Sequence, residues 1–217
     1  MLDGQVRPQC NREVLLDNKK NDKRILIIKK AIEEFSKYGY DNTDVDNIAK
    51  KANVGKGTIY RYFVSKDNLF LEVFVYIIRM MTSDLKKIID NDMCFKEKLD
   101  RMLEQSIIWL KESDKLIKLY TFDVARLHRI MEKNKELPMQ NKFSRYKILK
   151  SFIEKGQNEG LVVSEVSAEA LTSMIIGSMQ HSVMLYYGGY IKSFNKLEKR
   201  IRELIEYYKR IILKEVK

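Results

Sequence analysis

The stretch Asn53–Phe70, NVGKGTIYRYFVSKDNLF, decides how this sequence folds. Asn53 tolerates a left-handed backbone, and Gly55 has no side chain to obstruct the start of a new helix. The chain is therefore expected to turn sharply here. The apolar spacing that follows predicts a short helix over 56–63 whose apolar residues point inward. Lysine, threonine, tyrosine and arginine side chains are then left on or near its outer surface.

Two helices are predicted before this turn. The first covers about 22–38 and ends at Gly39, and the second begins after Thr43, with Asp46 completing a capping-box pattern. The apolar stripe of the first is formed by Ile25, Ile28, Ile32 and Phe35. The inner face of the second is formed by Val45, Ile48, Ala49 and Ala52. Two short helices joined by a tight turn on a supporting first helix form a helix-turn-helix.

The second helix of such a unit enters the major groove of DNA, so residues at its start must be small or long and polar. Gly57 and Thr58 would let the backbone approach, and Arg61 suits the bidentate reading of a guanine edge. Side chains suited to phosphate oxygens are those of Lys56, Tyr60, Tyr62 and Lys66. An ordinary amphipathic turn with solvated charges is the alternative interpretation of so short a segment.

Residues 25–74 as a whole resemble the DNA-binding domain of the TetR family of bacterial transcriptional regulators. The resemblance is carried by Phe35, Gly39, Tyr40, Thr43, Ile48, Ala49, Ala52, Val54, Gly57, Thr58, Ile59, Tyr60, Tyr62, Phe63, Ser65, Lys66, Asp67 and Leu69. It implies that DNA is contacted by Thr43, Lys56, Gly57, Thr58, Tyr60, Arg61, Tyr62 and Lys66. The usual turn reads Ala-Gly-Val-Ser, whereas this chain has Asn53 for the glycine and Gly55 for the serine. The second change removes a helix cap and a side chain that contacts phosphate.

The amino-acid composition is typical of a helical protein that binds a polyanion. With nine glycines and two prolines, and 45% apolar and 33% charged residues, the 217-residue chain is expected to be all-α and globular. The formal charge is +11, and residues 1–66 carry 14 basic and 9 acidic residues, against 27 and 21 in the rest. The basic density is therefore higher at the N-terminal end, which favours nucleic acid. A lysine-rich source proteome would produce the same excess.

A larger helical region is predicted after the helix-turn-helix. A long helix is expected over 65–90, followed by helices over 95–111, 115–133, 141–158, 168–187 and 194–214. We therefore expect an N-terminal extension (1–21), a helix-turn-helix domain (22–66) and a ligand-binding and dimerisation domain (67–217). In the extension Pro8 and Asn11 favour a flexible segment, and a basic arm in the minor groove is the alternative.

Aromatic and flexible side chains in the C-terminal region are typical of a mostly apolar ligand site, although such residues more often form plain core. The expected site residues are Trp109, Tyr120, Phe122, His128, Phe143, Tyr146, Met174 and Gln180. The final helix carries an apolar seam formed by Leu197, Ile201, Leu204, Ile205, Tyr208, Ile211 and Ile212. The resemblance implies a homodimer in which the last two helices form a four-helix bundle, and an intrachain core is the alternative. It also implies a repressor released from a pseudo-palindromic operator by a small apolar or amphipathic inducer.

Other classes of protein fit less well. The sequence has no Gly-rich phosphate loop, no nucleophile elbow and no metal-spaced cluster, so we predict neither an enzyme nor a cofactor or metal site. Cys10 and Cys94 are expected to be reduced thiols. An apolar run long enough for a membrane or a signal peptide is absent, which predicts a cytoplasmic protein. A ligand-independent architectural DNA-binding protein is the alternative function, but it leaves the large aromatic-rich C-terminal region unexplained.

Overall fold

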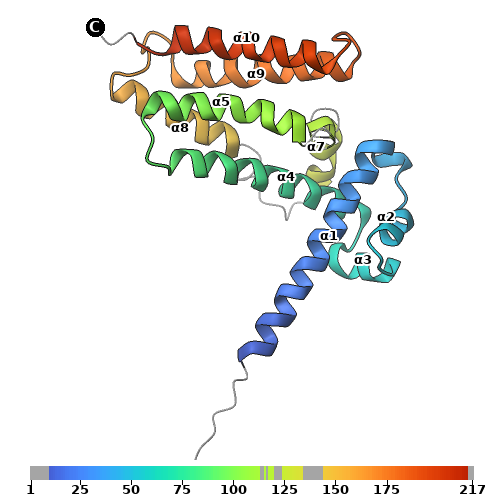
Figure 1. Cartoon of the computed structure of the whole chain (residues 1–217). Coiled ribbons are helices and arrows are strands. Elements are labelled where there is room, and N and C mark those ends of the chain that lie inside the picture. The colour runs from blue at the N-terminus through green and yellow to red at the C-terminus, as the bar shows by residue number, and fades with distance from the viewer. Residues whose placement is uncertain (1–9, 113–114, 116, 120–123, 134–143, 215–217) are drawn as a thin grey trace, which may run out of the picture. The chain divides into compact units, whose positions relative to one another are not determined.

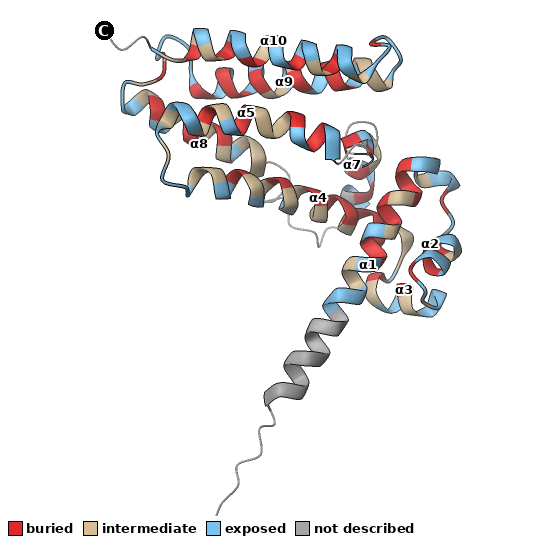
Figure 2. Cartoon of the chain, viewed as in Figure 1, coloured by how far each residue is buried: buried red, intermediate tan, exposed pale blue. Residues whose placement is uncertain are grey.

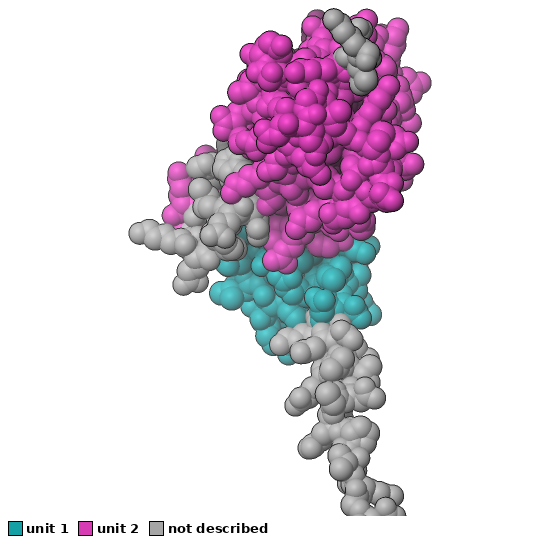
Figure 3. Space-filling model, turned by 90° about the vertical axis from the view of Figure 1, so that its left-hand side faces the viewer, with its two compact units in different colours: residues 1–73 teal, residues 74–217 magenta. Residues whose placement is uncertain are grey.

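The structure is a computed structural model of the chain, and it describes residues 10–112, 115, 117–119, 124–133 and 144–214. At residues 10–20, 124, 125, 128 and 131 it describes the backbone alone. Nine α-helices and no β-strand occur in this described part (Figure 1), so the all-α prediction is confirmed. The chain divides into two compact units, residues 1–73 and 74–217 (Figure 3). The division falls inside α4 (Lys66–Ile89), beyond the expected boundary at residue 66.

Unit 1 contains α1 (Cys10–Asn42), α2 (Val45–Lys51), α3 (Lys56–Phe63) and the first part of α4. The expected helix starts near residue 22, but α1 starts at Cys10, so residues 10–21 are helical as well. A helix can extend over this stretch because neither proline nor glycine occurs between Pro8 and Gly39. Residues 1–9 lie outside the described part. Gly39 interrupts the helix with a φ of 73°, which a residue without Cβ adopts readily.

The core of unit 1 forms where apolar stripes of its helices meet. The rings of Phe35 in α1 and Phe70 in α4 pack edge to face at 5.0 Å, and Tyr40 packs against Phe70 at 4.9 Å. The predicted inner face of α2 is confirmed, because Val45, Ile48, Ala49 and Ala52 are all buried. A buried carboxylate, Glu34 of α1, is paired with Lys51 of α2 at 2.6 Å. This contact fixes α2 against α1.

Unit 2 contains the rest of α4, α5 (Phe95–Glu112), α7 (Val124–Lys133), α8 (Ser144–Asn158), α9 (Ala168–Tyr187) and α10 (Phe194–Ile212). Within this unit α5 and α8 lie between the Phe74–Ile89 part of α4 and the pair α9 and α10 (Figure 1). The rings of Phe95 and Phe152 stack at 4.3 Å. A Cβ on Gly156 would lie 2.4 Å from the Phe95 ring, so only glycine permits this approach of α8.

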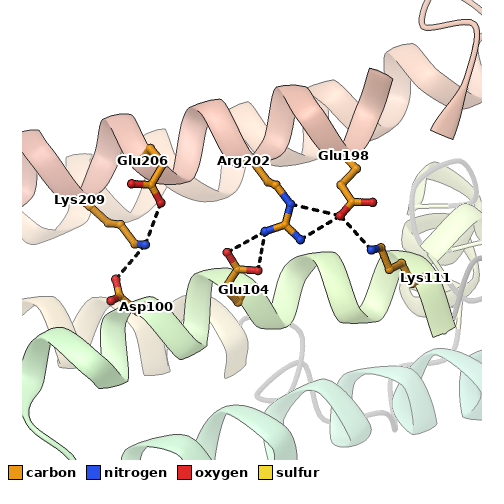
Figure 4. Close-up of polar contacts among 7 residues, drawn as sticks. All are labelled: Asp100, Glu104, Lys111, Glu198, Arg202, Glu206 and Lys209. Carbon is orange, nitrogen blue, oxygen red and sulfur yellow. Dashed lines mark hydrogen bonds and ion pairs between the residues drawn. The ribbon is translucent and has the colours of Figure 1, made fainter. Parts of the chain in front are cut away.

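Charged residues join α5 to α10 on the outside of unit 2 (Figure 4). Arg202 of α10 contacts both carboxylate oxygens of Glu104 at 3.1 Å and also Glu198 at 2.9 Å. Lys111 lies 2.8 Å from Glu198, and Lys209 lies 3.2 Å from Asp100. We call Asp100, Glu104, Lys111, Glu198, Arg202, Glu206 and Lys209 the α5–α10 ion-pair ladder. It holds α10 against α5 with contacts that are partly exposed to solvent.

Two predicted C-terminal helices are only partly described. Of the helix predicted over 115–133, residues 115, 117–119 and α7 (Val124–Lys133) are helical, and residues 116 and 120–123 lie outside the described part. Of the helix predicted over 141–158, α8 covers Ser144–Asn158, and residues 141–143 lie outside. The bounds of α9 are as predicted. Its N-cap is Ser167, whose side chain accepts a hydrogen bond from the Ala170 amide.

Candidate nucleic-acid interface and ligand cavity

The turn between α2 and α3 has the geometry that the sequence predicts. Asn53 adopts a φ of 52°, in the left-handed region that asparagine tolerates. Gly55 is the N-cap residue of α3, and no side chain caps the helix there. Ile59 and Phe63 are buried and Val54 is half-buried, so α3 packs through its apolar face.

The opposite face of α3 presents most of the predicted DNA-contacting residues to solvent. Lys56, Gly57, Tyr60 and Arg61 are exposed, and Thr58 and Tyr62 are half-buried. We call these six residues the α3 face. The guanidinium of Arg61 lies 5.7 Å from the centroid of the Tyr62 ring, a cation–π contact that orients it along the helix surface. The face thus combines two cationic side chains with two tyrosines and a threonine.

Gly57 leaves open space on this face. A Cβ built on Gly57 meets no atom within 4 Å, and its φ is not in the left-handed region. Neither packing within the chain nor backbone geometry therefore requires glycine at this position, although glycine costs helix stability relative to alanine. A residue without a side chain on an exposed helix face is what close approach of another molecule needs.

Thr43 occupies a different place from the one predicted for it. Its side chain is 3% exposed, and Oγ1 donates a hydrogen bond to the carbonyl of Gly39 at 2.6 Å. The N-cap of α2 is Asp44, whose carboxylate accepts from the Asp46 amide at 2.9 Å. The predicted capping role of Thr43 is therefore wrong, because its hydroxyl satisfies a carbonyl at the end of the preceding helix instead.

Two predicted phosphate-binding lysines already have partners in unit 1. Lys56 lies 2.9 Å from Asp46, and this hydrogen bond raises the pKa of its ammonium group. Lys66 donates to the carbonyl of Asp41 at 3.3 Å and lies 4.5 Å from the centroid of the Tyr40 ring. Lys56 is therefore protonated at neutral pH. Because Lys56 and Asp46 are solvent-exposed, exchanging Asp46 for a phosphate would cost little.

A cavity of about 90 Å³ lies among the helices of unit 2. Each helix contributes residues spaced three or four apart, which places them on one face. The described lining consists of Met81 and Leu85 of α4; Met102, Leu103, Ser106, Trp109 and Leu110 of α5; Ile117; Arg145 and Leu149 of α8; and Ile175, Ile176, Met179, Gln180 and Val183 of α9. It is apolar with three polar exceptions, as ligand sites usually are.

The predicted ligand residues are only partly brought together. Trp109 and Gln180 line the cavity, whereas Tyr146 and Met174 are not part of its described lining. The Tyr146 hydroxyl lies near the Glu169 carbonyl, at 3.5 Å, and Met174 is exposed on α9. Tyr120, Phe122 and Phe143 lie outside the described residues, as does the side chain of His128. Met81 and Met179, which sequence reasoning also places toward the ligand-binding core, line the cavity as well. Of the lining residues that it missed, Met102 belongs to an apolar stripe, while Arg145 has no apolar signal that marks it as cavity-lining.

The outer face of α9 carries exposed apolar residues beside the polar Ser173, Gln180 and His181. Met174, Gly177 and Met184 are exposed on α9, and Tyr207 is exposed on α10. The apolar seam predicted on α10 does not lie on this exposed surface. Its residues Leu197, Ile201, Ile205, Tyr208 and Ile212 are buried within the chain, and Leu204 and Ile211 are half-buried. Figure 2 shows buried and exposed residues alternating along α10. The buried seam packs inside unit 2, while the exposed face has no covering element among the described helices.

In the part of the chain that the structure describes, no group of three or more His, Cys, Asp or Glu side chains is arranged to hold a metal ion. Among the same residues, no helix is both long and apolar enough to cross a membrane.

Comparison with known proteins agrees with this architecture. The family model described as "Bacterial regulatory proteins, tetR family" matches residues 27–73. The helix-turn-helix transcriptional regulator YhgD of Bacillus subtilis is 34% identical over 99 residues, which cover 46% of this chain and 52% of YhgD. That match spans about half the length of YhgD.

Solved structures share the fold over most of the chain. FadR from Bacillus halodurans, a fatty acid degradation regulator, has a TM-score of 0.72 and 19% identity over 90% of this chain and 96% of its own. FadR from Bacillus subtilis, in complex with stearoyl-CoA, has a TM-score of 0.71 and 21% identity over 85% and 96%. Residues 27–73 therefore match the TetR family of bacterial transcriptional regulators, and YhgD and the FadR of Bacillus subtilis, to which the chain is similar, are transcriptional regulators.

Proposed function

We propose that this protein is a ligand-responsive repressor that binds a pseudo-palindromic operator as a homodimer and is released by a small apolar or amphipathic inducer. The observation that carries the proposal is the course of α4. This helix begins at Lys66, beside the predicted DNA-binding residues of unit 1, and its later residues Met81 and Leu85 line the cavity of unit 2. One continuous element therefore belongs to both functional regions.

On the DNA side, the α3 face is proposed to enter the major groove. Arg61 reads a guanine edge, Lys56, Tyr60 and Tyr62 contact phosphates, and Lys66 adds a phosphate contact at the start of α4. Gly57 and Thr58 allow the helix backbone to approach the bases. Thr43 acts indirectly, because its buried hydroxyl holds the junction between α1 and α2.

Dimerisation is proposed to use the outer face of α9 and α10. Met174, Gly177 and Met184 allow close approach of a second α9, and Tyr207 extends the apolar surface onto α10. A two-fold dimer places two α3 helices on one DNA face, which requires a separation near 34–36 Å for successive major grooves. Sedimentation should give a dimer at micromolar concentration. Met184→Glu should shift it toward monomer, whereas Ile108→Glu, at an exposed site on α5, should not.

Release of DNA then depends on differential binding. The inducer must bind the DNA-incompetent dimer more tightly, and a tenfold loss of operator affinity requires about 1.4 kcal/mol of differential binding free energy. A ligand that displaces α4 at Met81 and Leu85 would alter the position of Lys66 and, in the dimer, the spacing of the α3 helices. The stearoyl-CoA complex of Bacillus subtilis FadR supports an amphipathic molecule as the class to test.

The decisive experiment begins with selection of an operator from random DNA. The repressor is expected to select a pseudo-palindrome and to bind it far more tightly than random DNA, whereas an architectural protein would bind both alike. Arg61→Ala should cost about 1–3 kcal/mol and relax the preference at one base pair per half-site, while Tyr60→Phe should weaken binding to all sequences equally. Unchanged operator affinity in both variants, with the helical content intact by circular dichroism, would exclude the α3 face.

Reciprocity gives a second readout. Operator DNA must weaken inducer binding by the same factor by which inducer weakens operator binding. Titration calorimetry of an inducer with free protein and with the DNA complex measures this factor. Equal inducer affinities in the two titrations would reject the repressor mechanism and leave DNA binding itself in place.

A further inference from the structure

A carboxylate of α2 holds one of the two cationic side chains on the α3 face. The Lys56 ammonium donates a hydrogen bond to Oδ2 of Asp46 at 3.0 Å and lies 2.9 Å from Oδ1. The contact joins the first turn of α2 to the first residue of α3. Arg61, the other cation of the face, lies against the Tyr62 ring instead. Lys56 therefore already has an anionic partner before DNA arrives.

The place of Lys56 in α3 explains why it keeps this partner. Lys56 is the first residue of α3, where the positive end of the helix dipole disfavours a cation. The first turn of α3 contains no acidic residue that could offset this repulsion. The negative charge comes from α2 instead, since Asp46 lies in its first turn and the charge of Asp44 also raises the pKa of Lys56. Two carboxylates of α2 thus act on one ammonium group.

A DNA phosphate at Lys56 would compete with this partner. Phosphate and carboxylate oxygens accept hydrogen bonds from the same ammonium group. Both anions are negative, so a phosphate within reach of Lys56 is also repelled by Asp46. The side chains of Lys56 and Asp46 are 51% and 43% exposed, so the pair can open without burying either charge. The ammonium group can therefore pass from the carboxylate to the phosphate.

We propose that Asp46 competes with DNA phosphate for Lys56 and so lowers the affinity of the protein for all DNA sequences. This inference rests on the proposed function, since it concerns a residue beside the α3 face. When Lys56 moves to a phosphate, Asp46 is left to attract a cation from solution. A lysine that neutralises a phosphate releases about 0.9 counterions, and the cation drawn to Asp46 offsets this release. In the natural protein Lys56 therefore adds little to the salt dependence of binding.

The test measures the affinity for a random-sequence DNA duplex by fluorescence anisotropy at several salt concentrations, so it needs no operator. Asp46→Asn should bind DNA about twofold to fivefold more tightly, which is the range that an exposed ion pair allows. The slope of log affinity against log salt concentration should become steeper by about 0.9, since Lys56 then contributes a full counterion release. Asp46→Glu keeps the carboxylate and should resemble the natural protein in both quantities.

A double-mutant cycle shows whether the gain in affinity passes through Lys56. In a Lys56→Gln background, Asp46→Asn should give a smaller gain and almost no change in the salt slope. Glu33→Gln is the matched control, because Glu33 forms a partly exposed pair with Lys30 at 2.9 Å outside the α3 face. It should leave the salt slope unchanged, and any gain in affinity should be the same in both backgrounds. Circular dichroism checks that every variant keeps its helical content.

The outcomes separate this inference from the proposed function. Equal gains from Asp46→Asn in the two backgrounds, an unchanged salt slope, or equal effects of Asp46→Asn and Glu33→Gln would overturn the role of Asp46 and leave the repressor function in place. If the cycle shows the coupling but the protein selects no pseudo-palindrome, the competition at Lys56 stands and the repressor function fails. If the natural protein binds no duplex at all, both are rejected.

Discussion

The indole Nε1 of Trp109 donates a hydrogen bond to Oδ2 of Asp84 at 3.0 Å, which joins α5 to α4 beside the cavity. Trp109 is buried, and Leu85, the neighbour of Asp84, lines the same cavity. The carboxylate also lies 3.5 Å from Lys87, whose side chain is 74% exposed. One polar contact therefore holds together two helices whose apolar residues form the cavity wall.

Asp84→Ala should destabilise the fold by about 1–3 kcal/mol, because the buried indole N–H loses its acceptor. Asp84→Asn, which retains an acceptor oxygen, should cost less. Lys87→Ala is the control and should have almost no effect, since an exposed ion pair contributes little. Urea unfolding followed by circular dichroism measures the three free energies of unfolding. Equal stability of Asp84→Ala and Lys87→Ala would show that the indole bond does not stabilise the fold.

Gly57→Ala should change stability and DNA binding in opposite directions. The added Cβ meets no atom of the chain, and alanine reduces the entropy of the unfolded state, so the fold should gain about 0.4–1 kcal/mol. Operator affinity should fall, because the methyl group stands where the α3 backbone is proposed to approach the bases. Thermal unfolding and gel shifts on the same preparation test both effects. A variant that is more stable and binds the operator as well as the natural protein would argue against close approach at Gly57.

Val64 is held in a backbone conformation that a β-branched residue rarely adopts. It follows α3 with a φ of 59° and is 77% exposed, so its side chain gains little from burial. Val64→Gly should therefore stabilise the protein by about 1 kcal/mol, since relief of the left-handed strain exceeds the entropy cost of glycine. Val166→Gly serves as the control at an exposed valine without positive φ, and it should not stabilise. Urea midpoints that fall in both variants would exclude strain at Val64.

The α5–α10 ion-pair ladder should make stability depend on pH at the acid end. Hydrogen bonds from Lys111 and then Arg202 hold the pKa of Glu198 below its ordinary value of 4.5. A carboxylate with a lowered pKa in the folded state stabilises the fold above its unfolded pKa, and this contribution is lost as pH falls through the folded value. Glu198→Gln should therefore lower Tm slightly at pH 7 and lower it less near pH 3.

Thermal unfolding of both proteins between pH 3 and pH 7 measures this difference. Glu203→Gln is the matched control, because Glu203 is exposed on the same helix and is not part of the ladder, and it should leave the profile unchanged. One molar salt should also shrink the Glu198 effect, since partly exposed pairs are screened. A Tm difference that persists undiminished at pH 3 would mean that Glu198 acts through packing instead of charge.

The sequence by itself determined the helix-turn-helix and the positions of most helices. Asn53 has the left-handed backbone expected of it, α3 covers the predicted residues, and α9 has the predicted bounds. These features depend on local properties of the sequence, such as the helical spacing of apolar residues and the tolerance of asparagine for positive φ. They can therefore be derived from short stretches of sequence. The choice of N-cap was the exception, because Thr43 and Asp44 are both good caps and Gly39 offers an acceptor to Thr43.

Only the tertiary structure decided which helix each apolar helix face packs against. A stripe on α10 predicts that Leu197 and Ile201 are buried, but only the packed helices place them inside the chain and leave Met174 and Met184 of α9 outside. The cavity is assembled from side chains on several helices, so its lining depends on how those helices pack rather than on any one of them. Arg145 is the clearest case: a basic residue at a helix start reads as solvated surface, and only contact with helices distant in sequence makes it part of an apolar cavity.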